Sequence, residues 1–189
     1  MTDSDATPMT SSSDASRTLI VMRHAKSAWD TDDADHDRPL AKRGWRDALV
    51  AGHVLREFAD PIELVLCSTA TRTRQTWDRA VEGGARATNV EYRSEIYEAE
   101  SADLVGVLRA VPDELRSVLI LGHVPGVEHL VSALAAHDEH PGWQEMAVKY
   151  PTSAMAVLEI TSTWRELDPA SARLRAYLVP RGEKPDSAH

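Results

Sequence analysis

Histidine and arginine side chains follow three short apolar segments of the chain. Arg23 and His24 come after the first segment, Arg72 after the second and His123 after the third. Arginine offers planar pairs of N–H donors that match phosphate oxygens, and a neutral imidazole can attack phosphorus in line to give a phosphohistidine that water hydrolyses. One histidine after a strand would more simply be structural. Three such segments together predict a pocket for a phosphoryl group.

The apolar segments are typical of strands that are buried on both faces of a parallel sheet. They cover residues 18–22, 62–67 and 117–121, and further strand candidates cover 154–160 and 174–179. Apolar residues recur at helical spacing within 45–55, 104–111 and 127–134. Ser101 is a plausible N-cap of the second helix, and a helix start near Ala70 or Thr71 would direct backbone N–H groups at an anion. This alternation predicts an α/β fold whose ligands bind beyond the carboxyl ends of the strands.

The residues at these strand ends resemble the histidine phosphatase, or phosphoglycerate mutase-like, superfamily. Residues 23–25 are similar to its RHG signature, 68–76 to its SPxxRAxQT element and 122–126 to its GHNPG element. Residues 22–29, followed by 37–40 and 42–44, are most similar to the SixA-type phosphohistidine phosphatases. The resemblance spans about residues 18–160. It implies a three-layer α/β/α sandwich with a mostly parallel central sheet.

The resemblance also implies a role for each of the polar residues at the strand ends. His24 would be the phosphate-accepting nucleophile, and Arg23, Arg72 and His123 would hold the phosphoryl group. His123 would also serve as a second donor and as a cation in the transition state. Ser27, or the backbone of the surrounding loop, would add hydrogen bonds to the substrate.

The general acid is the role that the sequence defines least. Larger relatives use a Glu or Asp in the loop after a middle strand, where this chain has Glu95 and Glu98. A solvated acidic loop explains either residue equally well. A phosphoramidate leaving group is nitrogen and accepts a proton readily, so a phosphohistidine phosphatase needs a strong acid less than a phosphomonoesterase does.

Four positions depart from the wider superfamily pattern without removing a main catalytic group. Ala25 replaces Gly, as is common in the SixA-like group, while Thr69 replaces Pro and Val124 replaces Asn. Asp30 stands where many mutase-like members have Asn near the phosphate. Because a carboxylate there would repel phosphate, we expect Asp30 to point elsewhere.

Other kinds of chemistry have less support. Four residues separate Cys67 from Arg72, so the Cys-x5-Arg spacing of a cysteine phosphatase is not met, and we interpret Cys67 as a small apolar residue. The acidic and histidine-containing runs at 32–37 and 137–140 lack a recognised metal-ligand spacing and are interpreted as solvated loops. We expect neither a metal ion nor a cofactor.

Length, composition and charge limit the remaining function classes. A chain of 189 residues with 42% hydrophobic residues predicts one domain, which we place at 17–181 between disordered tails at 1–16 and 182–189. The net charge of −9 argues against nucleic-acid binding, because such binding depends on clustered Lys and Arg. The sequence shows neither a membrane span nor a signal peptide, so we expect a cytoplasmic protein that does not bind membranes.

These observations predict a phosphatase that hydrolyses phosphohistidine through a covalent intermediate on His24. Its partner would be a phosphorylated protein or a small phosphorylated substrate. Two alternatives stay open: a small-molecule phosphomonoesterase or mutase of the same superfamily, and a module that binds phosphorylated protein or nucleotide without turnover. His24 disfavours the module, because arginines alone would suffice for binding. Residues 83–116 are too short for a cap domain, and an open pocket favours a phosphoryl group carried by a protein.

Overall fold

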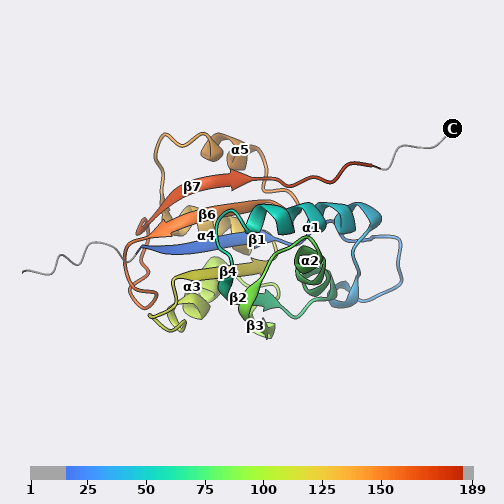
Figure 1. The fold of residues 1–189 in the computed structure, drawn as a ribbon, viewed down its shortest axis with the longest axis horizontal. Helices are drawn as coiled ribbons and strands as arrows, with labels where there is room; N and C mark the ends of the chain where they lie inside the picture. The colour runs from blue at the N-terminus through green and yellow to red at the C-terminus, as the bar shows by residue number, and fades with distance from the viewer. Residues whose placement is uncertain (1–15, 185–189) are drawn as a thin grey trace, which may run out of the picture.

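The computed structural model describes residues 16–184, so most of the predicted tail 1–16 and residues 185–189 of the predicted tail 182–189 lie outside the described residues. Seven strands form one sheet in the order β3-β2-β4-β1-β6-β7-β5 (Figure 1). The strands are β1 (Arg17–Arg23), β2 (Ile62–Ser68), β3 (Ala87–Arg93), β4 (Ser117–Gly122), β5 (Ala135–Ala136), β6 (Met155–Ile160) and β7 (Ala172–Leu178). The helices are α1 (Lys42–Leu55), α2 (Thr71–Glu82), α3 (Ser101–Arg109), α4 (Gly126–Leu134) and α5 (Gly142–Val148), with short 3-10 turns η1 (Asp35–Asp37) and η2 (Ser94–Ile96).

The sheet is mostly parallel, as predicted. Strands β1, β2, β3 and β4 run in the same direction, whereas β6 is antiparallel to both of its neighbours, β1 and β7. Parallel neighbours align their carboxyl ends: Arg23 of β1 is in register with Gly122 of β4, and Cys67 of β2 is in register with Leu121 of β4. The segments that follow β1, β2 and β4 therefore leave the sheet along one edge.

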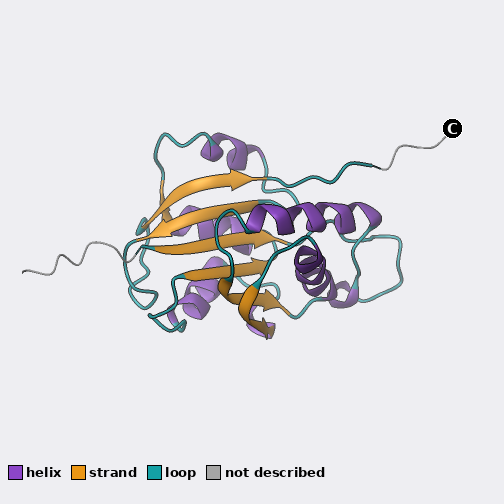
Figure 2. Cartoon of the chain, in the orientation of Figure 1, coloured by secondary structure: helices purple, strands orange, loops and turns teal. Residues whose placement is uncertain are grey.

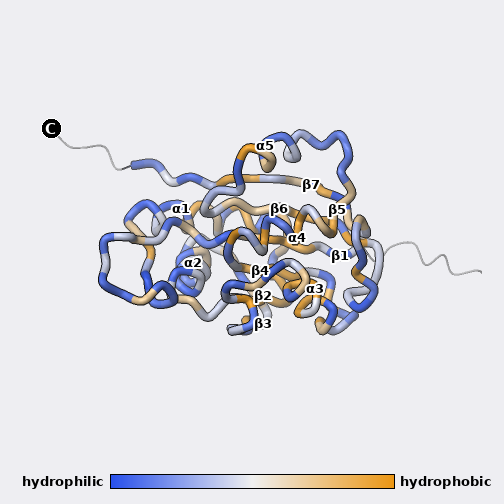
Figure 3. Tube along the Cα trace, turned by 180° about the vertical axis from the view of Figure 1, so that it is seen from behind, coloured by the Kyte–Doolittle hydropathy of each residue, from blue (hydrophilic) through white to orange (hydrophobic). Residues whose placement is uncertain are grey.

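Helices cover both faces of the sheet and complete the predicted three-layer sandwich (Figures 1 and 2). Alternating residues of β1 explain the two layers: Ile20 packs in a core with residues of α1 and α2, and Leu19 packs in a core with residues of α3, α4 and α5. Because both faces of β1 are buried, its sequence is continuously apolar. Hydrophobic residues accordingly concentrate in the central strands and α4, while the outer loops are mostly hydrophilic (Figure 3).

Helix starts agree with the sequence except at α3. Helix α2 begins at Thr71, as expected, but Ser101 is the first residue of α3 and its N-cap is Glu100. The expectation of Ser101 as the N-cap is wrong, because the backbone N–H of Glu100 donates to the carboxylate of Asp103 at 3.0 Å and so begins the helix one residue earlier. Among residues 16–184, no helix is both long enough and apolar enough to cross a bilayer.

The loop after β1 is fixed by its contact with α1. The backbone N–H of Ala41 donates to the carbonyl of Lys26 at 2.8 Å, and the first turn of α1 then lies directly against that carbonyl. A Cβ on Gly44 would collide with the Lys26 carbonyl oxygen, so only glycine allows the approach. This contact holds the residues that follow β1 over the edge of the sheet.

Candidate active site

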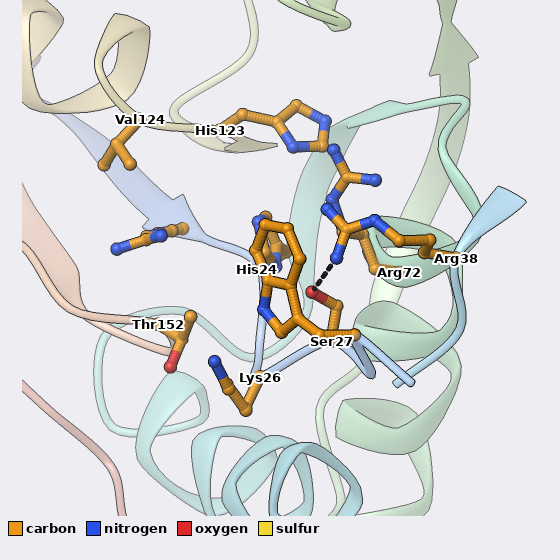
Figure 4. A pocket seen from close by; sticks show the side chains of 10 residues that line it. His24, Lys26, Ser27, Arg38, Arg72, His123, Val124 and Thr152 are labelled. Carbon is orange, nitrogen blue, oxygen red and sulfur yellow. Dashed lines mark hydrogen bonds between the residues drawn. The ribbon is translucent and has the colours of Figure 1, made fainter. Parts of the chain in front are cut away.

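A cavity of about 200 Å³ lies at the carboxyl ends of β1, β2 and β4 (Figure 4). Its walls contain the four side chains that the sequence placed at strand ends, together with six others. The lining residues are Arg23, His24, Lys26, Ser27, Trp29, Arg38, Arg72, His123, Val124 and Thr152. The structure therefore brings the predicted residues together, while their individual roles remain predictions.

His24 is oriented as a nucleophile requires. Its ring Nδ1 lies 2.7 Å from the carbonyl oxygen of Ala25, so Nδ1 carries the proton and the lone pair is on Nε2. Two hydrogen bonds fix the backbone of His24: its N–H donates to the carbonyl of Gly122, and its carbonyl accepts from the N–H of Ser153. The side chain is 7% exposed. Burial, and next the neighbouring His123, hold the pKa of His24 well below its usual 6.5, so the ring is neutral at physiological pH.

His123 faces His24 across the cavity, with 5.1 Å between the ring centroids. Its Nε2 lies 2.9 Å from the hydroxyl of Ser68, the last residue of β2. Burial lowers the pKa of His123 to about 3, and the cationic guanidinium of Arg72 adds to this effect. The free site therefore holds a neutral His123. The predicted imidazolium requires the negative charge of a bound phosphoryl group to raise that pKa.

Three residues that line the cavity each carry a buried nitrogen atom with no hydrogen-bond partner among the described residues. They are Nε of Arg23, Nε of Arg72 and Nδ1 of His123. The two arginine N–H groups are always donors. The hydroxyl of Ser68 can donate to Nε2 of His123, and the proton of that ring is then on Nδ1, which makes Nδ1–H the third donor. Buried donors normally have acceptors. Three of them around one cavity next to a neutral imidazole fit the oxygens of an anion such as a phosphoryl group.

Asp35 positions the two arginines on one side of the cavity. Its carboxylate accepts from Arg38 at 2.6 and 3.1 Å through one oxygen, and from Arg72 at 3.0 Å and the Tyr97 hydroxyl at 2.8 Å through the other. The hydrogen bonds from Arg38 and then Tyr97 hold the pKa of Asp35 far below its usual 3.8. Asp35 is therefore ionised and fixes the guanidiniums without being able to supply a proton.

Ser27 and Trp29 both contact Arg38. The Ser27 hydroxyl accepts from Nη1 of Arg38 at 3.1 Å and lines the cavity, in the place where the resemblance predicts a substrate contact (Figure 4). The guanidinium carbon of Arg38 lies 3.9 Å from the centre of the Trp29 ring, which is a cation–π distance. Trp29 is 71% exposed at the cavity rim.

The two predicted acid candidates do not reach the cavity. Glu95 lies in η2 and pairs with Arg93, and Glu98 is exposed in the following turn with a φ of 55°. Among the described residues, no Asp or Glu lines the cavity. Their suggested role as general acid gains no structural support. The segment after β3 does reach the site, but through Tyr97, whose hydroxyl contacts Asp35 and whose ring centre lies 5.5 Å from that of His123.

Cysteine and metal chemistry gain no support from the structure either. Cys67 is fully buried in β2, and burial raises the pKa of its thiol to about 12. Within residues 16–184, no group of three or more His, Cys, Asp or Glu side chains is arranged to hold a metal ion. Asp30 is exposed and lies outside the cavity lining, as expected from its charge.

Sequence reasoning missed several residues that shape the site. The sequence favours a solvated acidic loop around Asp35, although the spacing of three residues between Asp35 and Arg38 is a signal for an ion pair. Ser68 belongs to a recognised element but was given no role, and its hydroxyl contacts His123. Tyr97 and Thr152 reach the site from segments distant in sequence, and no local pattern marks them.

Comparisons with known proteins agree with this geometry. Residues 19–119 match the family model of the histidine phosphatase superfamily (branch 1). An uncharacterized protein of Mycobacterium tuberculosis is 38% identical over 85% of this chain and 100% of its own length. The solved structure of a SixA protein from Nakamurella multipartitia has a TM-score of 0.75 and 33% identity, covering 87% of this chain and 96% of that one.

A relative with a stated activity is the phosphohistidine phosphatase SixA of Escherichia coli, which is 28% identical over 69% of this chain and 81% of its own length. The family match covers more than half of the chain and includes Arg23, His24 and Arg72. The mycobacterial relative extends the likeness to 85% of the chain. The chain therefore belongs to branch 1 of the histidine phosphatase superfamily and is of the SixA type.

Proposed function

We propose that this phosphatase hydrolyses phosphohistidine on proteins through a phosphohistidine intermediate on His24. One observation carries the choice of substrate: among the described residues, a neutral imidazole and several donors line the cavity, but no carboxylic acid does. An alkoxide leaving group needs a proton from a well-placed acid, a contribution of typically about 10²–10⁴ in rate. The ring nitrogen of a phosphohistidine is basic and takes a proton readily, so this cavity suits it better.

The reaction follows from the arrangement of the donors. Nε2 of His24 attacks phosphorus while the N–P bond to the substrate imidazole breaks, and that imidazole takes a proton from solvent. The N–H groups of Arg23, Arg72 and His123 hold the three equatorial oxygens as charge spreads over them. Water then attacks the phosphorus on His24, which releases inorganic phosphate and restores the neutral ring. The carbonyl of Ala25 keeps the proton on Nδ1 throughout.

The substrate class is tested by comparing kcat/KM on a phosphohistidine peptide with kcat/KM on 3-phosphoglycerate. We expect kcat/KM to be about a hundredfold or more higher for the peptide, because the phosphoglycerate reaction lacks the rate contribution of a general acid. The rates should be unchanged in EDTA, because guanidinium groups supply the positive charge. A clear preference for phosphoglycerate would keep the family and overturn the substrate class. Tight binding of the peptide with no turnover would instead identify a binding module.

A further inference from the structure

A second cavity, which we call the basic subsite, adjoins the catalytic cavity. It has a volume of about 250 Å³ and contains five basic side chains and Thr152; the basic residues are Arg23, Lys26, Arg43, Lys149 and Arg181. Arg23, Lys26 and Thr152 line both cavities and form the boundary between them. In Figure 4, Lys26 and Thr152 lie on the opposite side of His24 from Arg38 and Arg72. The basic subsite therefore opens beside the phosphoryl site, on the side that Asp35 does not occupy.

Four separate segments build the basic subsite. Lys26 follows β1, Arg43 lies in the first turn of α1, Lys149 directly follows α5, and Arg181 follows β7. Hydrogen bonds join these segments at Thr152, whose hydroxyl accepts from Arg43 at 3.2 Å and whose carbonyl accepts from Arg181 at 2.8 Å. Tertiary contacts between these segments therefore form the subsite. Its basic residues do not all lie on one exposed element.

The charges in the basic subsite are only partly balanced. Arg43 and Arg181 both contact the fully buried carboxylate of Asp47, at 3.5 and 3.3 Å, and Asp47 can offset only one of the two charges. Lys26 and Lys149 form no ion pair among the described residues. In a chain with a net charge of −9, this is a local excess of positive charge next to the site of chemistry. Such an excess attracts anions.

The basic subsite holds no group able to carry out a second reaction. Among its described lining residues, none is a histidine, cysteine or carboxylate that could attack phosphorus. Its function is therefore binding. The guanidiniums of Arg43 and Arg181 are engaged with Asp47 and Thr152. The ammonium of Lys26 lies 5.8 Å from the centre of the Trp29 ring, and neither it nor that of Lys149 is paired with a carboxylate among the described residues. An ammonium group pairs with any single anionic group as a point charge. In a protein substrate, the anionic groups that lie beside a target histidine are the carboxylates of Asp and Glu.

We propose that the basic subsite binds an acidic side chain that flanks the phosphohistidine in a protein substrate. This inference rests on the proposed function and adds to it a sequence preference around the target histidine. The phosphoryl group enters the catalytic cavity, and a neighbouring Asp or Glu of the substrate pairs with Lys149 and Lys26. The hydroxyl of Thr152 accepts from Arg43, so its own proton is available to donate to the same carboxylate.

The test uses two phosphohistidine peptides that differ only in flanking residues, with Glu in one and Gln in the other. We expect wild-type kcat/KM to be about tenfold higher for the acidic peptide, the value of one hydrogen bond between charged groups. This ratio should fall with added salt. Lys149→Gln should bring the ratio close to one, Lys149→Arg should keep it, and Lys149→Glu should invert it. Lys149 is exposed, so these variants are expected to fold.

The matched control is Lys42→Gln. Lys42 is an exposed lysine beside Arg43 that lines neither cavity, so this variant should keep the tenfold ratio. Equal hydrolysis of both peptides by the wild type, or a ratio that Lys149→Gln leaves unchanged, overturns the subsite and leaves the proposed function standing. Hydrolysis of neither peptide overturns both. A third outcome is a preference for an alkyl bisphosphate over a monophosphate that Lys149→Gln removes, with no preference for the acidic peptide. That result assigns the subsite to a second phosphate group and overturns the proposal that it binds a carboxylate.

Discussion

The central strands and the edge strand of the parallel half of the sheet end in very different surroundings. Strands β1 and β4 each have a neighbour on both sides, and His24 and His123 after them face each other at 5.1 Å. Strand β3 has β2 on one side only, and Glu95 beyond it pairs with Arg93 in solvent. After β3 it is Tyr97, and neither Glu95 nor Glu98, that reaches the site. A charged residue after a parallel strand therefore predicts a place in the cavity most securely where other strand ends surround it.

Removal of the central nucleophile should have the largest effect. His24→Ala should lower kcat by about a thousandfold or more, because the other imidazole in the described cavity lining, that of His123, has its Nε2 held by the Ser68 hydroxyl and offers no free lone pair. The far-UV circular dichroism should be unchanged. Wild-type enzyme quenched during turnover should carry an acid-labile phosphoryl group that the variant lacks. Activity of the variant within tenfold of wild type would contradict the mechanism.

Loss of an arginine donor from the same central region should come next. Arg72→Ala should lower kcat/KM by about 10²-fold or more, because one donor to the transition state is typically worth about 3–4 kcal/mol. Steady-state kinetics on the phosphohistidine peptide measures this. Arg74→Ala is a matched control from the same helix, since Arg74 lies outside the cavity lining. Equal losses in both variants would mean that Arg72 acts only through the helix.

Weakening the support of that arginine should have a smaller effect. Asp35→Asn should lower kcat/KM by about tenfold, about 1.4 kcal/mol, because Arg72 and Arg38 lose a charged acceptor. The pKa of Asp35 is lowered in the folded protein, so its contribution to stability is present above pH 3.8 and is lost as the pH falls below it. Denaturant unfolding should separate wild type from Asp35→Asn at pH 7 and separate them less at low pH. A constant difference would argue against this ion pair.

The smallest effect should follow changes at the edge strand. Glu95→Gln and Glu98→Gln should each alter kcat by less than about threefold, because both carboxylates are exposed outside the cavity. The pH profile of kcat should keep its shape in both variants. A large loss of kcat together with a changed profile in either one would identify it as the general acid and would show that the end of β3 closes over the substrate.

The same contrast explains how much could be predicted from the sequence. The apolar strands, their mostly parallel arrangement and the meeting of His24 with Arg72 and His123 follow from local patterns, because register places these strand ends at one edge. Asp35 and Thr152 could not be placed in this way. Their positions depend on how a loop and the segment before β6 fold back over the edge of the sheet, and polar loop residues show no periodicity that encodes such contacts. Glu95 and Glu98 are candidates by residue type and by their place after a middle strand, as in larger relatives, and neither criterion tells which side chain of that segment enters the cavity.

The three buried donors of Arg23, Arg72 and His123 have a consequence for the end of the catalytic cycle. In the proposed mechanism they contact only oxygens on phosphorus, and inorganic phosphate presents the same oxygens after hydrolysis. That mechanism predicts product inhibition, with phosphate competing against the substrate. How fast the enzyme turns over would then depend on the phosphate concentration around it, and phosphate release could limit the rate when substrate is abundant.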